Sequence, residues 1–502
     1  MKSLCHALFS FCAPFCIPAR AAIIMAIALA AASCAENPVS GQKDFVLMSE
    51  QDEIEMGRTA HPNILKQYRR LEDPALQAYV QELGERLAQK SHRSHLIYRF
   101  TVLDSTEVNA FALPGGYIYI TRGLLAYLNS EAELAAVLGH ELGHVTARHS
   151  VRQISASQAT GLGLAIGSIL IPELRNQAAQ DVFNVLGNAW ISGYGREHEL
   201  ESDRLGAEYL AASGYDPQAM LKVIGVLKNQ EIFEKQLAKE EGREARAYHG
   251  VFASHPDNDT RLQEVVAKAD ALKTTTASRI NREALLKKIE GMTFGDGEQD
   301  GIRRANHFYH KDLGFALSFP VGWRVENLPD RLVARSPAND ALLMVNTTDL
   351  NERMPPSEFM AKRLKIGQLT QGEPLHSNGL EGYTAIATVN TPFGRRPTRF
   401  SVIYFKNQAF LFVGSAKDEK TPNRYDGEFL QTVRSLHGLT DQERHLAKAL
   451  HIKIIKASAT TRYADLARTS SIQHHAEEQL RLLNGDYPSG EPAAGEQIKI
   501  VE

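Results

Sequence analysis

Cysteine is scarce in this sequence of 502 residues, which contains only four. They are Cys5, Cys12, Cys16 and Cys34. The chain beyond position 34 can therefore form no disulfide and no thiolate metal site, and a metal ion bound there would need histidine and carboxylate ligands. An excess of basic charge is missing too, because the formal net charge is −3. Without such an excess we expect no nucleic-acid partner.

Long hydrophobic runs are also missing. A helix that spans a membrane needs about 20 apolar residues, whereas the apolar runs over 21–32 and 159–171 are shorter. The first run follows Arg20 and is typical of a secretory signal, so residues 1–33 are predicted to be a signal peptide. The second run contains glycines and is predicted to be a buried or membrane-touching helix.

The predicted signal ends in small residues that lead directly to the last cysteine, Ala31-Ala32-Ser33-Cys34. This order resembles the lipobox of bacterial lipoproteins, in which the cysteine is lipidated after cleavage before it. We therefore expect lipidation at Cys34, a lipidated tether over 34–44, and a place on the periplasmic side of the bacterial cell envelope. Ala35 favours the outer membrane by analogy. The alternative is an ordinary cleaved signal that contains a cysteine.

The sequence His140-Glu141-Leu142-Gly143-His144 lies in a helix predicted from about 130 to about 149. Positions four apart share a face of a helix, so the two imidazoles can bind one Zn²⁺. Glu141 can then act on water beside the metal. The pair is flanked by apolar residues, so the helix is predicted to be buried, and buried histidines need partners. An incidental pair on a surface helix fits this setting poorly.

A catalytic zinc needs a third protein ligand and an open fourth position. The segment 196–204 (REHELESDR) offers Glu197, Glu199 and Glu201. Glu199 shares a helix face with Asp203, so Glu199 could bind the metal while Asp203 accepts a hydrogen bond from the outer nitrogen of a ligating histidine. The alternative is a solvated acidic helix face.

Three ordered motifs together resemble the HtpX-like family of zinc metallopeptidases, which includes the CAAX prenyl endopeptidases and the BepA-like periplasmic proteases. The motifs are residues 109–116 (NAFALPGG), the His-Glu-Leu-Gly-His helix and residues 199–204 (ELESDR); residues 37–41 (NPVSG) resemble lipoprotein members. The resemblance implies a mainly α gluzincin metallopeptidase domain, predicted over 45–290, with one zinc ion per chain. It also implies Glu199 as the third ligand.

Further histidines lie near these motifs. In related periplasmic members a His-Pro pair can approach the zinc, and His255-Pro256 is the matching pair here. His255 would cap the metal or stabilise an oxyanion, and a loop histidine held by the following proline is the equal alternative. His149 is predicted to be a structural residue at a helix end, and His198 is predicted to point away from the metal.

A chain of this length should form two or three domains, and the pattern changes after the peptidase region. Residues 291–304 are predicted to be a linker, and 305–440 an α+β domain that resembles PsbP-like modules around Phe319–Trp323. Residues 447–502 are predicted to form a small βααβ unit that resembles a LysM-like module, which would imply affinity for peptidoglycan. The predicted fold is therefore multidomain.

The predicted reaction is hydrolysis of peptide bonds in envelope proteins, including misassembled ones. Glu141 would take a proton from zinc-activated water and pass it to the leaving amine. Strand 117–121 is predicted to offer an edge to which the substrate pairs. The alternatives are a non-catalytic envelope assembly factor or chaperone and a peptidoglycan-binding scaffold.

Overall fold

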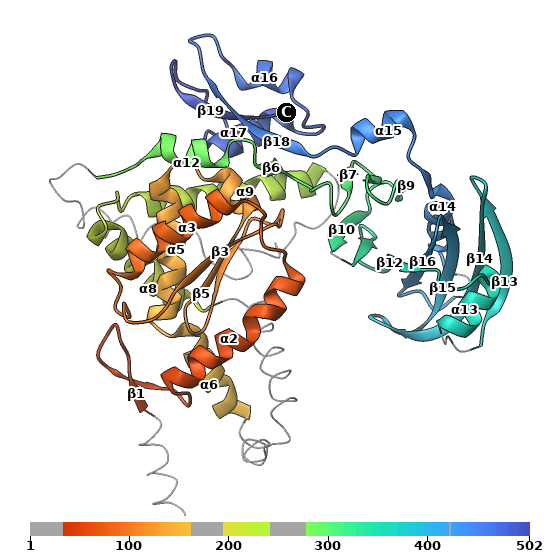
Figure 1. The fold of residues 1–502 in the computed structure, drawn as a ribbon, viewed down its shortest axis with the longest axis horizontal. Helices are drawn as coiled ribbons and strands as arrows, with labels where there is room; N and C mark the ends of the chain where they lie inside the picture. The colour runs from red at the N-terminus through yellow and green to blue at the C-terminus, as the bar shows by residue number, and fades with distance from the viewer. Residues whose placement is uncertain are drawn as a thin grey trace, which may run out of the picture.

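The computed structural model describes residues 34–161, 194–240, 278–328, 330–364, 366, 368–420 and 423–502. Figure 1 shows a helical N-terminal body, drawn in red to yellow-green, and a separate β-rich body at the right of the view. The C-terminal residues, in blue, return to the helical body. The predicted signal peptide and most of the apolar run 159–171 lie outside the described residues.

The N-terminal body is built mainly from helices, and its sequence explains where they begin. The helix α3 starts at Pro74, after Asp73, whose side chain accepts a hydrogen bond from the Leu76 backbone. Its predicted apolar face is buried, at Leu76, Val80, Leu83 and Leu87. The helices of this body are α2 (Glu50–Gln67), α3 (Pro74–Ala88), α4 (Arg122–Tyr127), α5 (Glu131–Thr146), α6 (His149–Gly161), α8 (Arg196–Ala212), α9 (Ala219–Glu240) and α12 (Arg282–Ile289).

A three-stranded sheet packs beside these helices, in the order β3 (Arg99–Leu103), β5 (Tyr117–Thr121), β4 (Ala110–Leu113). The sequence predicted β3 and β5 but only a turn-rich approach at 109–116, where the structure has β4. Gly115 and Gly116 form the turn between β4 and β5 with φ of 76° and 91°, a backbone that favours glycine. Because β5 is the central strand, the prediction that it offers a free edge is wrong.

The helix that carries the His-Glu-x-x-His motif is shorter than predicted. It begins after Ser130, whose side chain accepts a hydrogen bond from the Glu133 backbone, and ends at Thr146. Arg148 then has a φ of 57°, and α6 starts at the next residue. The buried Arg148 side chain holds this bend, because its Nε lies 2.9 Å from Oε2 of the buried Glu53.

The C-terminal unit has the predicted βααβ order, with β18 (Leu450–Lys456), α16 (Tyr463–Thr469), α17 (Ala476–Asn484) and β19 (Gln497–Val501). Its strand β18 also pairs with β6 (Thr293–Phe294), inside the predicted linker. The stretch 291–304 therefore contains paired strands, because β7 (Ile302–Arg304) pairs with β8 (His307–His310) as well.

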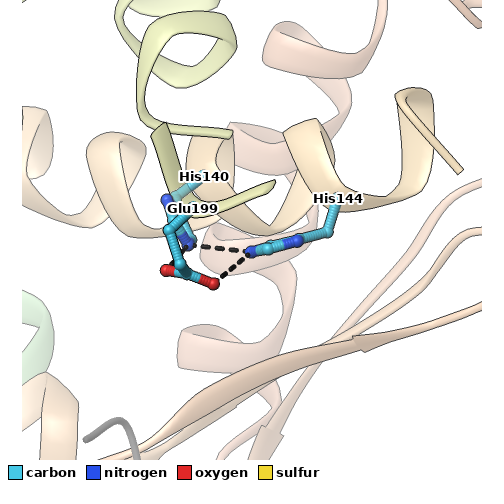
Figure 2. Close-up of side chains that lie close together, drawn as sticks. All are labelled: His140, His144 and Glu199. Atoms are coloured by element: carbon cyan, nitrogen blue, oxygen red, sulfur yellow. Dashed lines mark hydrogen bonds and ion pairs between the residues drawn. The ribbon is translucent and has the colours of Figure 1, made fainter. Parts of the chain in front are cut away.

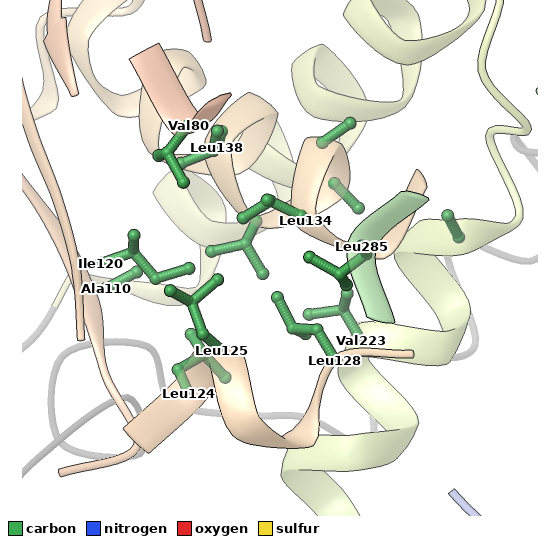
Figure 3. Packing of buried hydrophobic residues seen from close by; sticks show 14 of the residues in the cluster. Val80, Ala110, Ile120, Leu124, Leu125, Leu128, Leu134, Leu138, Val223 and Leu285 are labelled. Atoms are coloured by element: carbon green, nitrogen blue, oxygen red, sulfur yellow. The ribbon is translucent and has the colours of Figure 1, made fainter. Parts of the chain in front are cut away.

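The C-terminal unit shares one hydrophobic core with the helical body. Leu480 and Ile498 belong to the same buried cluster as Leu124 and Leu138, part of which Figure 3 shows where α3, α4, α5, α9 and α12 meet. The buried Lys499 adds a polar contact, because its Nζ donates to the carbonyl oxygens of residues 126 and 128 at 2.6 and 2.9 Å. Residues 126 and 128 lie at the C-terminal end of α4, where the backbone carbonyl groups of a helix have no hydrogen-bond partner within the helix.

The β-rich body has its own cores, which include Phe410, Phe412 and Phe429 in one cluster and Met360 and Val402 in another. Its seven-stranded antiparallel sheet has the order β10 (Arg324–Leu328), β11 (Arg331–Arg335), β12 (Ala341–Asp349), β16 (Gln408–Ala416), β15 (Gly394–Phe405), β14 (Leu380–Thr391) and β13 (Thr370–Ser377). A four-stranded sheet has the order β17 (His437–Gly438), β9 (Phe315–Ser318), β8, β7. The helices are α13 (Pro356–Arg363), α14 (Asp426–Ser435) and α15 (Asp441–Leu446).

The first described residues form a hairpin. Cys34 begins β1 (Cys34–Glu36), which pairs antiparallel with β2 (Lys43–Phe45). Asn37 stabilises the turn, because its Oδ1 accepts a hydrogen bond from the Val39 backbone at 2.8 Å. In the part of the chain that the structure describes, no helix combines the length and the apolar character that crossing a membrane requires.

Candidate metal centre

The motifs predicted to bind a metal lie on two helices, α5 and α8, that pack very closely. A Cβ atom placed on Gly143 of α5 would lie 3.0 Å from Cα of Ser202, and one placed on Gly206 of α8 would lie 3.0 Å from the backbone nitrogen of His140. The glycines thus let the two backbones approach each other. This approach brings Glu199, near the start of α8, to the two histidines of α5.

The side chains of His140, His144 and Glu199 converge (Figure 2). The two Nε2 atoms are 3.0 Å apart, and they lie 3.5 and 3.4 Å from the nearest oxygens of Glu199. Three ligands at 2.0–2.1 Å from a tetrahedral zinc would be about 3.3 Å apart. The distances therefore fit a zinc ion, and the donor set of two imidazoles and a carboxylate suits it as well.

The second acidic residue predicted for the site, Asp203, is completely buried beside His140. Its Oδ1 lies 2.8 Å from Nδ1 of His140, which is the predicted contact. Burial lowers the pKa of His140, but the charges of Asp203 and Glu199 and their hydrogen bonds raise this pKa above its ordinary value. The pocket therefore favours a positive charge at its centre.

His144 contacts a third histidine that the sequence placed only at a helix end. Nδ1 of His149, the first residue of α6, lies 2.9 Å from Nδ1 of His144. On its other side His149 contacts Glu201, with 3.0 Å between Nε2 and Oε2. Burial lowers the pKa of His149, whereas the hydrogen bond to His149 is the main cause that lowers the pKa of Glu201 to about 2.

His198 stacks on the ring of His149, with centroids 4.3 Å apart, and is not among the converging ligands. Burial is the main cause that lowers the pKa of His198 to about 4. Tyr194, which the sequence did not single out, stacks on His144 with centroids 4.0 Å apart. It lies just ahead of α8 in irregular structure, where no periodicity could have indicated it.

Glu141, which follows His140 in α5, is buried, with 2% of the residue exposed. Burial and the charges of Glu141 and Glu199 raise the pKa of Tyr194, although its hydrogen bond to Ser150 opposes the change. The remaining candidate, His255, lies outside the described residues.

Two histidines one turn apart on a buried helix, joined by a glutamate from a second helix, are the arrangement typical of a zinc metallopeptidase. In agreement, residues 74–269 match the family described as Peptidase family M48. The chain therefore carries a domain of peptidase family M48, which confirms the resemblance seen in its motifs.

Curated relatives agree with this family. The beta-barrel assembly-enhancing protease of Yersinia pestis is 29% identical over 440 residues, which cover 82% of this chain and 85% of that protein. The putative beta-barrel assembly-enhancing protease of Vibrio cholerae is 37% identical over 157 residues, which cover 30% of this chain and 32% of that protein. The mitochondrial metalloendopeptidase OMA1 of Arabidopsis thaliana is 32% identical over 149 residues, 30% of this chain and 29% of that protein.

Two of these alignments thus span about a third of the relative's own length. Together with the family match they make this chain a metalloendopeptidase. Among solved structures, cyanobacterial PsbP from Synechocystis is 16% identical and covers 28% of this chain and 96% of its own, with a TM-score of 0.22. A similarity of that size carries no argument about the β-rich body.

Proposed function

We propose that this chain is a zinc-dependent endopeptidase of the bacterial cell envelope that hydrolyses peptide bonds in envelope proteins, including misassembled ones. The observation that carries the proposal is the convergence of ligand atoms from His140, His144 and Glu199 within 4.8 Å. These three residues would hold one zinc ion, and Asp203 would orient the imidazole of His140 through the hydrogen bond to its outer nitrogen.

The residues around this centre have distinct roles in the proposed reaction. A zinc ion bound there supplies Lewis-acid chemistry, which polarises a carbonyl and acidifies water. Glu141 accepts the proton of the attacking water on its carboxylate and later donates it to the nitrogen of the leaving amine. Burial of Glu141 keeps bulk water away from this proton transfer. His255 is proposed to cap the metal or to stabilise the oxyanion.

The substrate is proposed to bind as an added strand on β4, in place of the central strand β5. In the described sheet β4 stands at the edge, in the order β3-β5-β4. It also lies against α5, the helix of the two histidines. An extended peptide paired to this edge would be held by main-chain hydrogen bonds beside the helix that carries His140 and His144.

Zinc content and proteolysis of the full chain test the proposal. Purified protein should contain one zinc ion, lose it to a chelator and regain it on addition of zinc. Glu141→Gln should keep the zinc but lose proteolysis of an unfolded test protein such as casein by at least about a hundredfold. Cleavage by Glu141→Gln at the wild-type rate would remove Glu141 from the reaction, and protein that takes up no zinc would refute the proposal.

The envelope address rests on the sequence and on the relatives. Two of them are named for enhancing the assembly of β-barrels. We propose that the substrates of this chain are proteins of the bacterial cell envelope. Cys34 is proposed to be lipidated and to anchor the protein to the outer membrane. Incorporation of labelled palmitate into the wild-type protein, and its loss in Cys34→Ala, would support this; equal labelling would exclude Cys34.

A second candidate activity concerns the C-terminal unit. We propose that 305–440 is a PsbP-like domain and that 447–502 is a LysM-like module with affinity for peptidoglycan, supported by the β18-α16-α17-β19 order. Deleting residues 447–502 would remove part of the hydrophobic core of the peptidase domain. The affinity is therefore tested by sedimentation of the full chain with purified peptidoglycan, and by substitutions at exposed side chains of this unit, such as Arg468→Glu. Absence of co-sedimentation by the wild-type chain would reject the affinity.

A non-catalytic assembly factor is the remaining alternative, which Glu141→Gln distinguishes.

A further inference from the structure

The outer nitrogen of His144 is the start of a continuous path of polar contacts. It runs from Nδ1 of His144 to Nδ1 of His149 over 2.9 Å, and from Nε2 of His149 to Oε2 of Glu201 over 3.0 Å. Nη1 of Arg152 lies 3.2 Å from the same carboxylate oxygen. Side chains from α5, α6 and α8 are thus joined to one metal ligand.

The direction of each hydrogen bond follows from the coordination of His144. When Nε2 of a neutral imidazole gives its lone pair to a metal ion, the proton of the ring is on Nδ1. His149 must then accept at its own Nδ1, so that its proton is on Nε2 and is donated to Glu201. Arg152 donates to Glu201 as well and leaves that residue a fixed acceptor. Every nitrogen along the path has a consistent role.

The ring of His149 is also held in place by its surroundings. The residue is fully buried, and the ring of His198 covers one of its faces. The hydroxyl of Ser202 approaches Nδ1 of His149 at 3.4 Å, a longer contact than the one from His144. The ring of His149 is therefore held at its edge by hydrogen bonds and on one face by stacking.

We propose that His149 is a positioning residue that fixes the orientation and the proton of His144, with Glu201 and Arg152 behind it, as Asp203 does for His140. Each zinc-binding imidazole would then have its own partner, one a carboxylate and the other a neutral histidine. This inference rests on the proposed zinc site. Partners of this kind typically change metal affinity by about 10–100-fold when they are removed.

Zinc affinity, measured by competition with a fluorescent chelator, tests the role of His149. His149→Phe keeps a ring but removes both nitrogens, and we expect its zinc affinity to fall by about 10–100-fold. His149→Gln retains an acceptor and a donor and should recover part of the loss. The spectrum of the cobalt-substituted protein should change in the same order, and the thermal midpoint of the metal-free variants separates a loss of folding from a loss of positioning.

Glu201 provides a second test that does not depend on a buried ring. Glu201→Ala should weaken zinc binding several-fold, whereas Glu197→Ala, an exposed position one turn earlier on α8, should leave it unchanged. The inference is overturned if His149→Phe binds zinc as tightly as the wild type, if His149→Gln is no better than His149→Phe, or if the two alanine variants are equal. A wild-type protein that binds no zinc would instead refute the proposed function.

Discussion

Gly143 of α5 lies so close to Ser202 of α8 that a Cβ atom on the glycine would be only 3.0 Å from both Cα and the carbonyl oxygen of the serine. The separation of the two helices is therefore set by the absence of a side chain at this position. Because His144 and Glu199 flank the contact, the same separation sets how near the carboxylate comes to the imidazoles.

Enlarging this contact should loosen the metal centre. Gly143→Ala forces backbone atoms of α8 to move, and we expect a loss of about 1–3 kcal/mol in the free energy of unfolding together with weaker zinc binding. The measurements are urea unfolding and chelator competition. Gly225→Ala is the matched control, because a Cβ there meets no atom within 4 Å, and it should be neutral or stabilising by about 0.5–1 kcal/mol. Equal effects of the two substitutions would contradict the prediction.

The hydrogen bond between Asp203 and His140 should contribute to zinc affinity through its charge. Asp203→Asn keeps the size of the side chain but removes the negative charge, and we expect affinity to fall by about 10–100-fold. Glu208→Gln on the same helix, at a side chain that is 50% exposed, is the control. Unchanged affinity in Asp203→Asn, measured against the chelator, would show that the contact does not support the metal.

Glu107 should make the protein less stable as pH rises. Burial, and then the charge of Glu326, raise the pKa of Glu107 to about 7. The folded state therefore binds this proton more tightly than the unfolded state does, and stability falls between the ordinary pKa of a glutamate and pH of about 7. Glu107→Gln should remove about 1–3 kcal/mol of this loss. Urea unfolding at pH 5 and pH 8 tests the difference, and the exposed Glu72→Gln should follow the wild type.

The C-terminal unit and the peptidase domain should unfold together. Leu480 of α17 is fully buried in the shared core, so Leu480→Ala should cost about 2–5 kcal/mol. This loss of stability should lower the thermal midpoint at which zinc is released, and should not be confined to unfolding of residues 447–502. Lys453→Ala, which breaks only an exposed ion pair, should change the midpoint little. Zinc release at the wild-type temperature in Leu480→Ala would show that the two parts are independent.

Local patterns in the sequence were enough to predict much of the fold. The apolar spacing of α3, the limits of β5 and most strands of the β-rich body follow from residues near one another in the chain. The same holds for His140 and His144, because one helical turn brings them together. Glu199 and Asp203 required a further argument about helix faces, and it predicted the side of α8 that meets α5.

The features that the sequence did not predict depend on contacts between distant residues. The bend at Arg148 depends on Glu53, 95 residues earlier, and nothing near Arg148 indicates a positive φ. The strand β6 depends on β18, which comes much later in the chain, so 293–294 looked like part of a linker. β4 has only four residues and lies beside two glycines, so the segment was predicted as a turn and not as a strand. His149 gains its contacts only when α8 packs against α6.

The position of β19 has a consequence for how the protein is made. Residues 497–501 contribute to the same hydrophobic core as α5, yet they are synthesised long after it. A nascent chain that has not yet reached residue 497 therefore lacks part of the hydrophobic core of its own peptidase domain. Such a chain should be a poor enzyme and a ready substrate for other proteases, which would restrict peptide-bond cleavage to molecules that already contain β19.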